Sequence, residues 1–289
     1  MLPVRRLVLV AFLAVACGAV PVQAKSLSLA FHSGDTYRYS FHSSTKQTIV
    51  ASGMTIPTDI ELTAGETVKV NSVDSSGVAD LTLTVSNFVI KGTTGGVTNT
   101  TTGTPAITMD VKVAADGRIV SMDGNQMAAG DPFLAFSGMG GGFFVTAILP
   151  SNAAKPGDTW SKDYDQANPG GTGSIHVTSK SKYLRDESLN GVNAAVVETT
   201  STGAIDINVG APIAAGAPTA GFGGMSIKGT VTTDVTTWID PNSHRVLKTH
   251  STESNDGTMA INLSSSSALP GLTGPMTIKG TGTTDLTPA

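Results

Sequence analysis

Cysteine is nearly absent from this sequence: its 289 residues contain one, Cys17, which lies in the apolar N-terminal segment. If that segment is removed, the remaining chain can form no disulfide and has no thiolate to bind a metal or act as a nucleophile. Charged residues (14%) and aromatic residues (5%) are also scarce. The folded part must therefore be stabilised by backbone pairing and by burial of mostly aliphatic side chains.

The first 24 residues have the three parts of an export signal. Arg5 and Arg6 form a short basic start, residues 7–20 form an apolar run, and Val22 and Ala24 offer small residues for cleavage. The run is too short to span a bilayer stably, and no stop-transfer pattern follows it. We therefore interpret residues 1–24 as a signal peptide. We expect a secreted protein of the periplasm, cell envelope or medium, with no transmembrane segment after cleavage.

A lipoprotein signal is the alternative interpretation. Leu13-Ala-Val-Ala16 would then precede a lipidated Cys17, which would anchor the protein to a membrane. A large aliphatic residue usually stands three positions before such a cysteine, whereas Ala14 stands there in this chain. Cleavage after Ala24 is therefore favoured over lipidation.

The net charge excludes one class of partner. Cleavage after Ala24 removes two of the 18 basic residues and none of the 22 acidic ones, so the net charge changes from −4 to −6. The chain has no basic cluster that could attract a phosphate backbone. We therefore expect no nucleic-acid partner, and the sequence leaves the oligomeric state open.

Alternation of apolar and polar residues is the dominant pattern along the chain. Tyr37, Tyr39 and Phe41 share one parity, as do Leu81, Leu83 and Val85, which predicts half-buried strands. Turn signals separate the strands: Asp74–Gly77, Asp116–Gly117, Asn190–Gly191 and Asn255–Gly257. Helix is predicted in one place, residues 125–136, which have few β-branched residues. The pattern predicts a mainly β protein with antiparallel hairpins.

An internal repeat of roughly 120 residues is the second informative feature. Its matching segments are Gly34-Asp35-Thr36-Tyr37 with Gly157-Asp158-Thr159-Trp160, Asp74–Val78 with Asp186–Val192, and Asp116–Val120 with Asp240–Leu247. We predict a first β repeat at residues 25–150 and a second at 151–289. The fold expected is two similar curved antiparallel sheets, forming an incomplete barrel or a sandwich, with one short helix or apolar segment at their junction. Tyr37 and Trp160 should occupy equivalent positions.

The junction between the repeats is unusually apolar. Its candidate ligand-contacting residues are Phe133, Phe136, Phe143, Phe144, Ile148 and Leu149. Gly140, Gly141 and Gly142 interrupt this run and weaken any helix that could span a membrane. We expect the segment to pack against the concave face of a curved sheet, or to act as a mobile flap over an apolar cavity.

The segment that begins the second repeat resembles a motif of known sequences. Lys155-Pro-Gly-Asp-Thr-Trp160 follows Pro150, and Asn190-Gly-Val192 lies downstream. This arrangement is similar to the P-x-x-x-V-x-x-G-D-S/T-W motif of an uncharacterised family of bacterial exported proteins and lipoproteins, with Lys155-Pro156 in place of the usual aliphatic residue. The resemblance implies an envelope location and a β fold. It brings no functional residues, because the family has no established activity.

Catalytic and metal-binding patterns are missing or explained by chance. The two Ser-x-x-Lys matches, Ser43–Lys46 and Ser179–Lys182, fall in predicted strands, where residues three apart point to opposite faces. Asp163–Gly170 has oxygen ligands but not the spacing of a calcium loop, so we interpret it as a capped turn. We expect no enzyme activity, no cofactor and no metal.

Three hypotheses for function follow from the architecture alone. The first is a non-enzymatic envelope protein that holds an apolar small molecule or lipid. The second is a surface or matrix protein that binds other envelope components. A hydrolase of unknown type is the third.

The signal-peptide interpretation makes a direct prediction about the exported protein. Because the small residues Val22 and Ala24 frame the cleavage position, the mature chain should begin at Lys25. Intact-mass measurement of the exported protein checks this. A mass that corresponds to a diacylated chain starting at Cys17 would show a lipoprotein instead.

Overall fold

The computed structural model describes residues 23–102, 106–123, 146–167, 174–210, 222–263 and 275–289. In these ranges the chain forms twelve strands. The strands of the first half are β1 (Thr36–Ala51), β2 (Met54–Val73), β3 (Ala79–Thr94), β4 (Val97–Thr102), β5 (Ile107–Val113) and β6 (Ile119–Asp123). Those of the second half are β7 (Thr159–Ala167), β8 (Ser174–Leu189), β9 (Val192–Gly210), β10 (Phe222–Asp240), β11 (Arg245–Leu263) and β12 (Pro275–Pro288).

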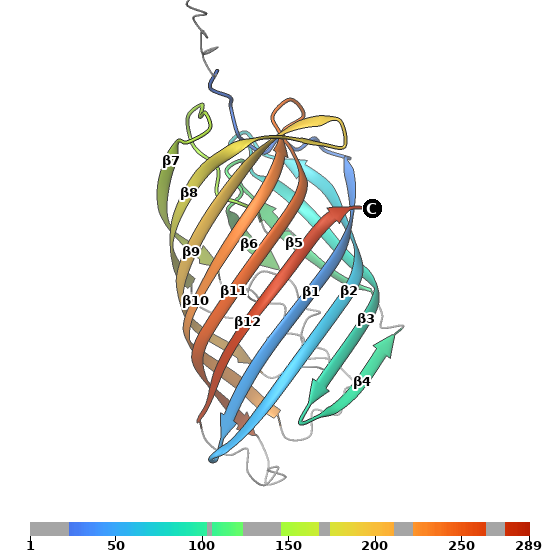
Figure 1. Ribbon diagram of the computed structural model, residues 1–289, viewed down its shortest axis with the longest axis vertical. Helices are drawn as coiled ribbons and strands as arrows, with labels where there is room; N and C mark the ends of the chain where they lie inside the picture. The colour runs from blue at the N-terminus through green and yellow to red at the C-terminus, as the bar shows by residue number, and fades with distance from the viewer. Residues whose placement is uncertain (1–22, 103–105, 124–145, 168–173, 211–221, 264–274) are drawn as a thin grey trace, which may run out of the picture.

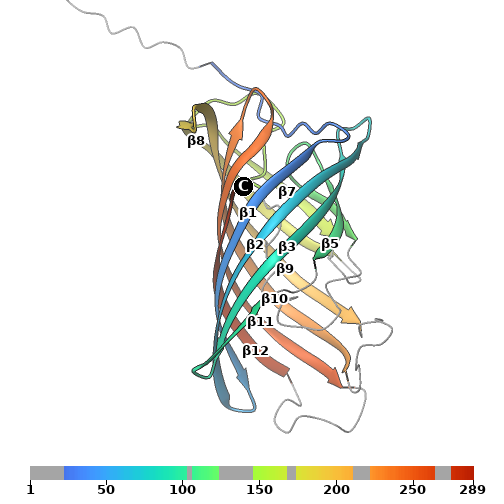
Figure 2. The ribbon, with the colours of Figure 1, turned by 90° about the vertical axis from the view of Figure 1, so that its right-hand side faces the viewer.

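All twelve strands belong to one antiparallel sheet with the order β6-β5-β3-β2-β1-β12-β11-β10-β9-β8-β7, and β4 pairs with β3 beside this path. The sheet curls so that its end strands β6 and β7 approach each other (Figures 1 and 2). No ladder among the described residues joins those two strands. The prediction of a mainly β, curved antiparallel fold is confirmed. The halves form one sheet instead of two, because β1 pairs with β12.

Strand β1 shows how the sequence produces the two faces of this sheet. Its residues alternate between exposed and buried along the whole strand, with Tyr37, Tyr39 and Phe41 buried on the concave side. Thr36, Arg38 and other polar residues between them face solvent. This period of two places one apolar set inside the curve and one polar set outside it.

Three of the four predicted turns are confirmed. Gly77, Gly117 and Gly191 connect neighbouring strands with φ values of 81°, 88° and 83°, which a residue with a Cβ rarely adopts. The turn predicted at Asn255–Gly257 is wrong, because these residues lie inside β11 and pair with both β10 and β12. Ladders on both sides of a strand override the local preference of asparagine and glycine for turns.

The capped turn predicted at Asp163–Gly170 is also wrong in its first part. Asp163 and Asp165 lie within β7, where they pair with Thr178 and His176 of β8. Both aspartates are exposed on the convex side. Residues 168–170 of that segment and the helix predicted at 125–136 lie outside the described ranges, as do residues 1–22.

The turns that open the two halves have the same hydrogen bonds. Gly34 N–H donates to the carbonyl of Val70 at 2.9 Å, and Gly157 N–H donates to that of Tyr183 at 2.7 Å. In return, the amides of Val70 and Tyr183 donate to the carbonyls of Asp35 (2.9 Å) and Asp158 (3.0 Å). Both glycines have positive φ, 92° and 97°. Each turn is thus hydrogen-bonded to the residue, Val70 or Tyr183, that lies next to the strand it opens. The duplication of residues 25–150 in residues 151–289 stays a prediction.

The N-terminal segment of residues 25–31 crosses one end of the curved sheet, which we call the capped end. Leu27 and Leu29 are buried there, and backbone hydrogen bonds attach the segment to Ala154, Ala115 and His244. The main hydrophobic core lies at this end. Its largest members include Tyr39, Tyr183, Val68, Val70, Leu81, Leu83, Val111, Val113, Leu149 and Ile239.

Trp160, the first aromatic residue of β7, anchors residues 146–149 to the sheet. It is only partly buried, unlike Tyr37, and its indole N–H donates to the carbonyl of Ile148 at 2.9 Å.

Replacing Trp160 tests this anchor. Because the ring packs on the core, Trp160→Ala should lower the free energy of unfolding by about 3 kcal/mol. Trp160→Phe keeps most of the packing but removes the N–H donor, and should cost about 1 kcal/mol. Urea denaturation of the three proteins measures both values. Equal losses for the two variants would contradict a role of the ring in packing.

Candidate functional site

The concave face of the sheet carries three successive bands of side chains. The band nearest the capped end is the hydrophobic core described above. Near the opposite end lies a second apolar band, formed by Ile49, Ala51, Met259, Met276 and Ile278. Between them lies a polar belt of inward-facing residues: Ser43, Thr45, Gln47, Ser179, Ser181, Thr199, Thr237, Thr249, Glu253 and Asn255. A buried polar belt between apolar bands needs hydrogen-bond partners.

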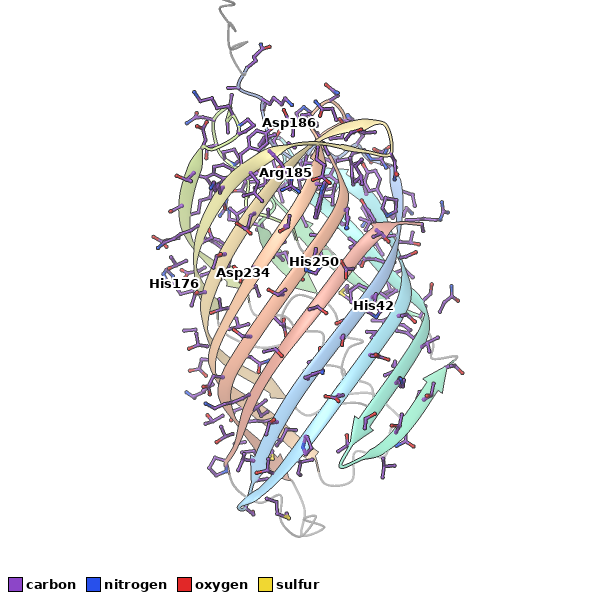
Figure 3. The ribbon with its side chains drawn as sticks, viewed as in Figure 1. His42, His176, Arg185, Asp186, Asp234 and His250 are labelled. Carbon is purple, nitrogen blue, oxygen red and sulfur yellow. The ribbon has the colours of Figure 1, made fainter. Side chains whose placement is uncertain are left out.

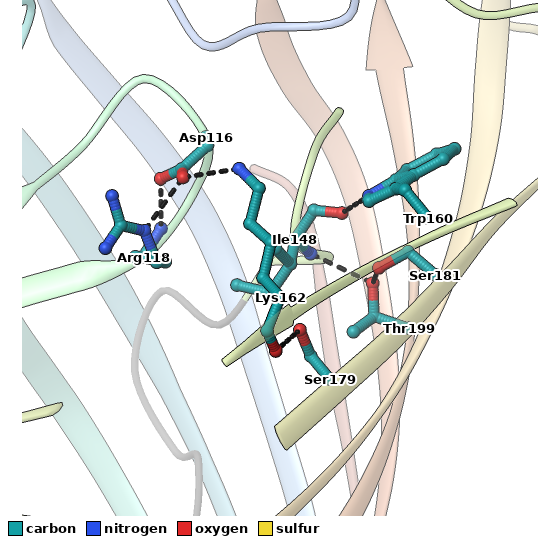
Figure 4. A network of polar contacts seen from close by, with 8 residues as sticks. All are labelled: Asp116, Arg118, Ile148, Trp160, Lys162, Ser179, Ser181 and Thr199. Atoms are coloured by element: carbon teal, nitrogen blue, oxygen red, sulfur yellow. Dashed lines mark hydrogen bonds and ion pairs between the residues drawn. The ribbon is translucent and has the colours of Figure 1, made fainter. Parts of the chain in front are cut away.

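On the β8–β10 side, residues 146–149 supply those partners. The amide of Ala147 donates to the hydroxyl of Thr237 at 2.8 Å, and the amide of Ile148 donates to that of Thr199 at 2.9 Å. Ser181 and Thr199 share a hydrogen bond of 2.8 Å, and the Ser179 hydroxyl donates to the carbonyl of Lys162 at 3.0 Å (Figure 4). This half of the belt is satisfied by the protein itself.

On the β1–β12–β11 side, the belt has polar atoms without such partners. Gln47 is 4% exposed and Thr249 also 4%, yet neither Gln47 Oε1 nor Thr249 Oγ1 has a hydrogen-bond partner among the described residues. The same holds for Asn255 Oδ1. A buried acceptor left unpaired costs about 1–3 kcal/mol. These atoms are therefore candidates for contact with a ligand.

Glu253 adds a carboxylate to the same side of the belt. It lies between Thr233 of β10 and Gly282 of β12 in the ladders, and no described residue forms an ion pair with it. Burial raises the pKa of this carboxyl above its ordinary value, because the charged form loses hydration. Its inward direction was not foreseen from the sequence.

Two glycines of β12 lie directly against these groups. A Cβ on Gly280 would lie 2.9 Å from Asn255 Oδ1 and 3.0 Å from Gln47 Cγ. A Cβ on Gly282 would lie 3.1 Å from Glu253 Cγ and 3.3 Å from Thr45 Oγ1. Both positions are thus tight for any larger residue, because side chains of β1 and β11 already lie over the two glycines.

The two ends of the sheet are linked by side chains near the capped end. Lys162 of β7 donates to Asp116 Oδ2, in the turn between β5 and β6, at 2.6 Å (Figure 4). Arg118 donates to the same oxygen at 2.8 Å, and its guanidinium lies 5.7 Å from the ring centroid of Tyr164. We call this contact between β5–β6 and β7 the seam. At the seam an ion pair joins the two edges of the sheet, and no backbone ladder between β6 and β7 occurs among the described residues.

The charge state of Asp116 depends on two opposing effects. Burial raises the pKa of its carboxyl, but hydrogen bonds from Lys162 and Arg118 outweigh burial and hold the pKa below its ordinary value. The carboxylate is thus ionised throughout the neutral range and available to both cations.

The residues singled out in the sequence are only partly brought together. Ile148 and Leu149 are buried, 4% and 0% exposed, in the segment that lies on the concave face. Phe133, Phe136, Phe143 and Phe144 lie outside the described residues, as do Gly140, Gly141 and Gly142. The turn residues Gly34, Asp35, Gly157 and Asp158 lie at the capped end and do not line the polar belt.

The histidines and the Ser-x-x-Lys matches do not form chemical sites. His42, His176 and His250 lie on three separate strands of the convex side (Figure 3), and the last two pair singly with Asp165 and Asp285 at 2.9 Å. No group of three His, Cys, Asp or Glu that could hold a metal occurs within the described ranges. In the part of the chain that the structure covers, no helix has the length and hydropathy needed to cross a membrane.

Sequence reasoning missed Gln47, Glu253 and Asn255. One signal could have indicated them: the repeated strand sequence Ile227–Val235 has Val231 where its copy Ile278–Leu286 has Gly282. Gly280 and Gly282 therefore share one face of β12, and a strand interior loses packing at each glycine. The neighbours of these glycines become known only from the ladder register.

The seam makes a testable prediction about stability and pH. Because the folded-state pKa of Asp116 is depressed, its ion pairs stabilise the fold above the ordinary carboxyl pKa of about 3.9, and this stabilisation is lost as the pH falls through the folded-state value. Asp116→Asn should lower the free energy of unfolding by about 2 kcal/mol at pH 7, and by much less near pH 3. Urea denaturation at both pH values measures this. The exposed control Asp59→Asn should change it by less than about 0.5 kcal/mol.

Comparisons with known proteins give a likeness among solved structures. No family model matches this sequence, and no curated protein matches it. Among solved structures, the chain is similar to lipovitellin in a structure titled "Lipid-protein interactions in lipovitellin", with 11% identity and a TM-score of 0.44. The match covers 90% of this chain and 26% of the lipovitellin chain, so this chain spans about a quarter of that protein. No residue role or ligand is carried across from it.

Proposed function

We propose that this protein is exported and holds an apolar or lipid-like ligand against the concave face of its sheet, without catalysing a reaction. The observation that carries the proposal is the half of the polar belt on β1, β12 and β11, where buried acceptors lack partners among the described residues. This half-belt adjoins the apolar band of Ile49, Met276 and Ile278. An amphipathic molecule matches both surfaces, with its tail on the band and its polar group at the belt.

The packing at the capped end indicates the direction in which the tail of such a ligand would point. The core there is filled by the sheet, by Leu27 and Leu29 and by residues 146–149. The tail would therefore point away from the capped end, toward Met259 and Met276. Methionine side chains adapt to irregular apolar shapes, which suits a flexible tail.

The export part of the proposal rests on the sequence of residues 1–24. The first described residues support a mature start near Lys25, because Lys25 already belongs to the fold. It forms a backbone bridge with Ala154 and an ion pair of 2.7 Å with Asp186, whereas Gln23 and Ala24 are exposed.

Binding to other envelope components is a second candidate, favoured by β4. All six residues of this strand are exposed, and it pairs only with β3 among the described strands. Such an edge can accept a strand of another chain. This candidate needs no ligand on the concave face, so a binding measurement separates the two.

Titration with an apolar fluorescent probe tests the carrier function. The wild-type protein should bind the probe saturably, and Met276→Gln should weaken binding about tenfold, since a polar amide replaces an apolar contact of about 1.4 kcal/mol. The matched control Thr277→Gln changes the neighbouring residue, which is not part of the buried band, and should bind as wild type does. If the folded wild-type protein binds no probe, the carrier function is wrong and the envelope-binding candidate stands.

A further inference from the structure

We propose that the outer edge of β4 pairs with β4 of a second copy of this chain, in an antiparallel ladder centred on Thr100. The strand lies at the margin of the sheet, beside β3 (Figure 1), and all six of its residues are exposed. The inference goes beyond the proposed function, because it names the same protein as the partner of this edge. It does not depend on a ligand at the concave face.

The turn before β4 determines which of its backbone groups point outward. Gly95 and Gly96 have positive φ, 57° and 86°, and join Thr94 to its ladder partner Val97, as a two-residue type I′ turn does. Thr94 and Val97 are therefore a hydrogen-bonded pair, and such pairs recur at every second residue of an antiparallel ladder. The odd-numbered residues of β4 thus direct their backbone N–H and C=O groups toward β3. The backbone groups that point away from β3 belong to the even-numbered residues: Thr98, Thr100 and Thr102.

These outward groups form an open edge among the described residues. Residues 97–102 belong to no described ladder other than the one with β3, and no described turn hydrogen bond uses their backbone groups. The next strand along this side, β6, pairs with β5 only from Asp110 onward and so does not cover β4. A row of unpaired N–H and C=O groups is a template for a further strand.

The charge of the edge favours a second copy as that further strand. No charged residue occurs between Lys91 and Asp110. Lys91 lies behind Thr100 in the ladder, and its ammonium is paired with Glu61 at 3.3 Å. Edge strands usually carry charges that oppose pairing with a copy of themselves, and β7, at the other end of the sheet, has three charged residues among its nine. Strand β4 lacks this protection.

One antiparallel register uses all the outward groups of β4. Since hydrogen-bonded pairs can form only between even-numbered residues, Thr100 faces Thr100 of the second copy, and Thr98 faces Thr102. Each pair exchanges two hydrogen bonds, so the three pairs form about six. The side chains that meet are threonines, which pair favourably across antiparallel strands. The two copies are then related by a two-fold axis at Thr100, the commonest symmetry of protein dimers.

Sedimentation velocity tests the association. Because the interface is small, we expect a reversible equilibrium in which the dimer predominates at about 100 µM. Thr100→Lys sets two like charges against each other at the two-fold axis and should weaken the dimer at least about tenfold. The matched control Thr202→Lys adds the same charge at an exposed position of β9, inside the sheet, and should dimerise as the wild type does. Circular dichroism checks the fold of each variant.

Two outcomes of this measurement would overturn the proposal. A wild-type protein that stays monomeric at that concentration would exclude self-pairing and leave the edge to a strand of another protein. A Thr100→Lys variant that dimerises as strongly as the wild type would show that the copies meet through another surface.

Single cysteines test the register of the pairing. In a Cys17→Ser background, a cysteine introduced into β4 is the one cysteine of the chain. Thr100→Cys sets two facing residues with Cα atoms about 5.5 Å apart, within reach of a disulfide. In Thr98→Cys, the matched control, the two cysteines are four residues apart along the ladder, or about 13 Å. Under mild oxidation, Thr100→Cys should form a disulfide-linked dimer on a non-reducing gel, and Thr98→Cys should not. Equal cross-linking of the two variants would overturn pairing about Thr100.

Discussion

The ladder between β1 and β12 is the interaction on which the rest of the structure depends. Twelve residue pairs, from Tyr39–Pro288 to Val50–Thr277, join the first and last strands of the chain. Without this ladder the two halves would be separate sheets, each with an unpaired edge and an exposed apolar face. The ladder also sets Gln47 beside Gly280, so the polar belt becomes continuous only where the two ends of the chain meet. Architecture and candidate site therefore have the same physical origin.

Glycine has two different roles on the concave face. Gly229 of β10 and Gly257 of β11 are direct partners, and a Cβ on Gly229 would lie 2.4 Å from the carbonyl oxygen of Asp256. Only glycine tolerates such close backbone approach. Gly280 and Gly282 instead border side chains of their neighbours. One pair of glycines thus permits two backbones to approach closely, and the other lets neighbouring side chains pack over β12.

The sequence predicts the strand content well, because alternation records which face each residue will occupy. The positions of Tyr37, Leu81 and Leu83 on the buried side follow from parity alone. Local turn chemistry was less reliable: Asn255–Gly257 became extended because β10 and β12 pair with it on both sides. The candidate site could not be found in this way. Gln47 and Asn255 are far apart in the chain, and only the register of two ladders shows that they meet at Gly280.

The seam distinguishes this sheet from one whose ladders run all the way round. Near the capped end its edges are linked by the ion pair of Asp116 with Lys162 and by the hydrogen bond from Leu149 N–H to the Asp116 carbonyl, and no described ladder joins β6 to β7. A change in circumference toward the other end would therefore break no described ladder hydrogen bond between β6 and β7. Such a change in circumference would make the thickness and length of the proposed ligand weak criteria for selection. Under the proposed function, discrimination among ligands would then come from the polar groups, whose positions the central ladders fix.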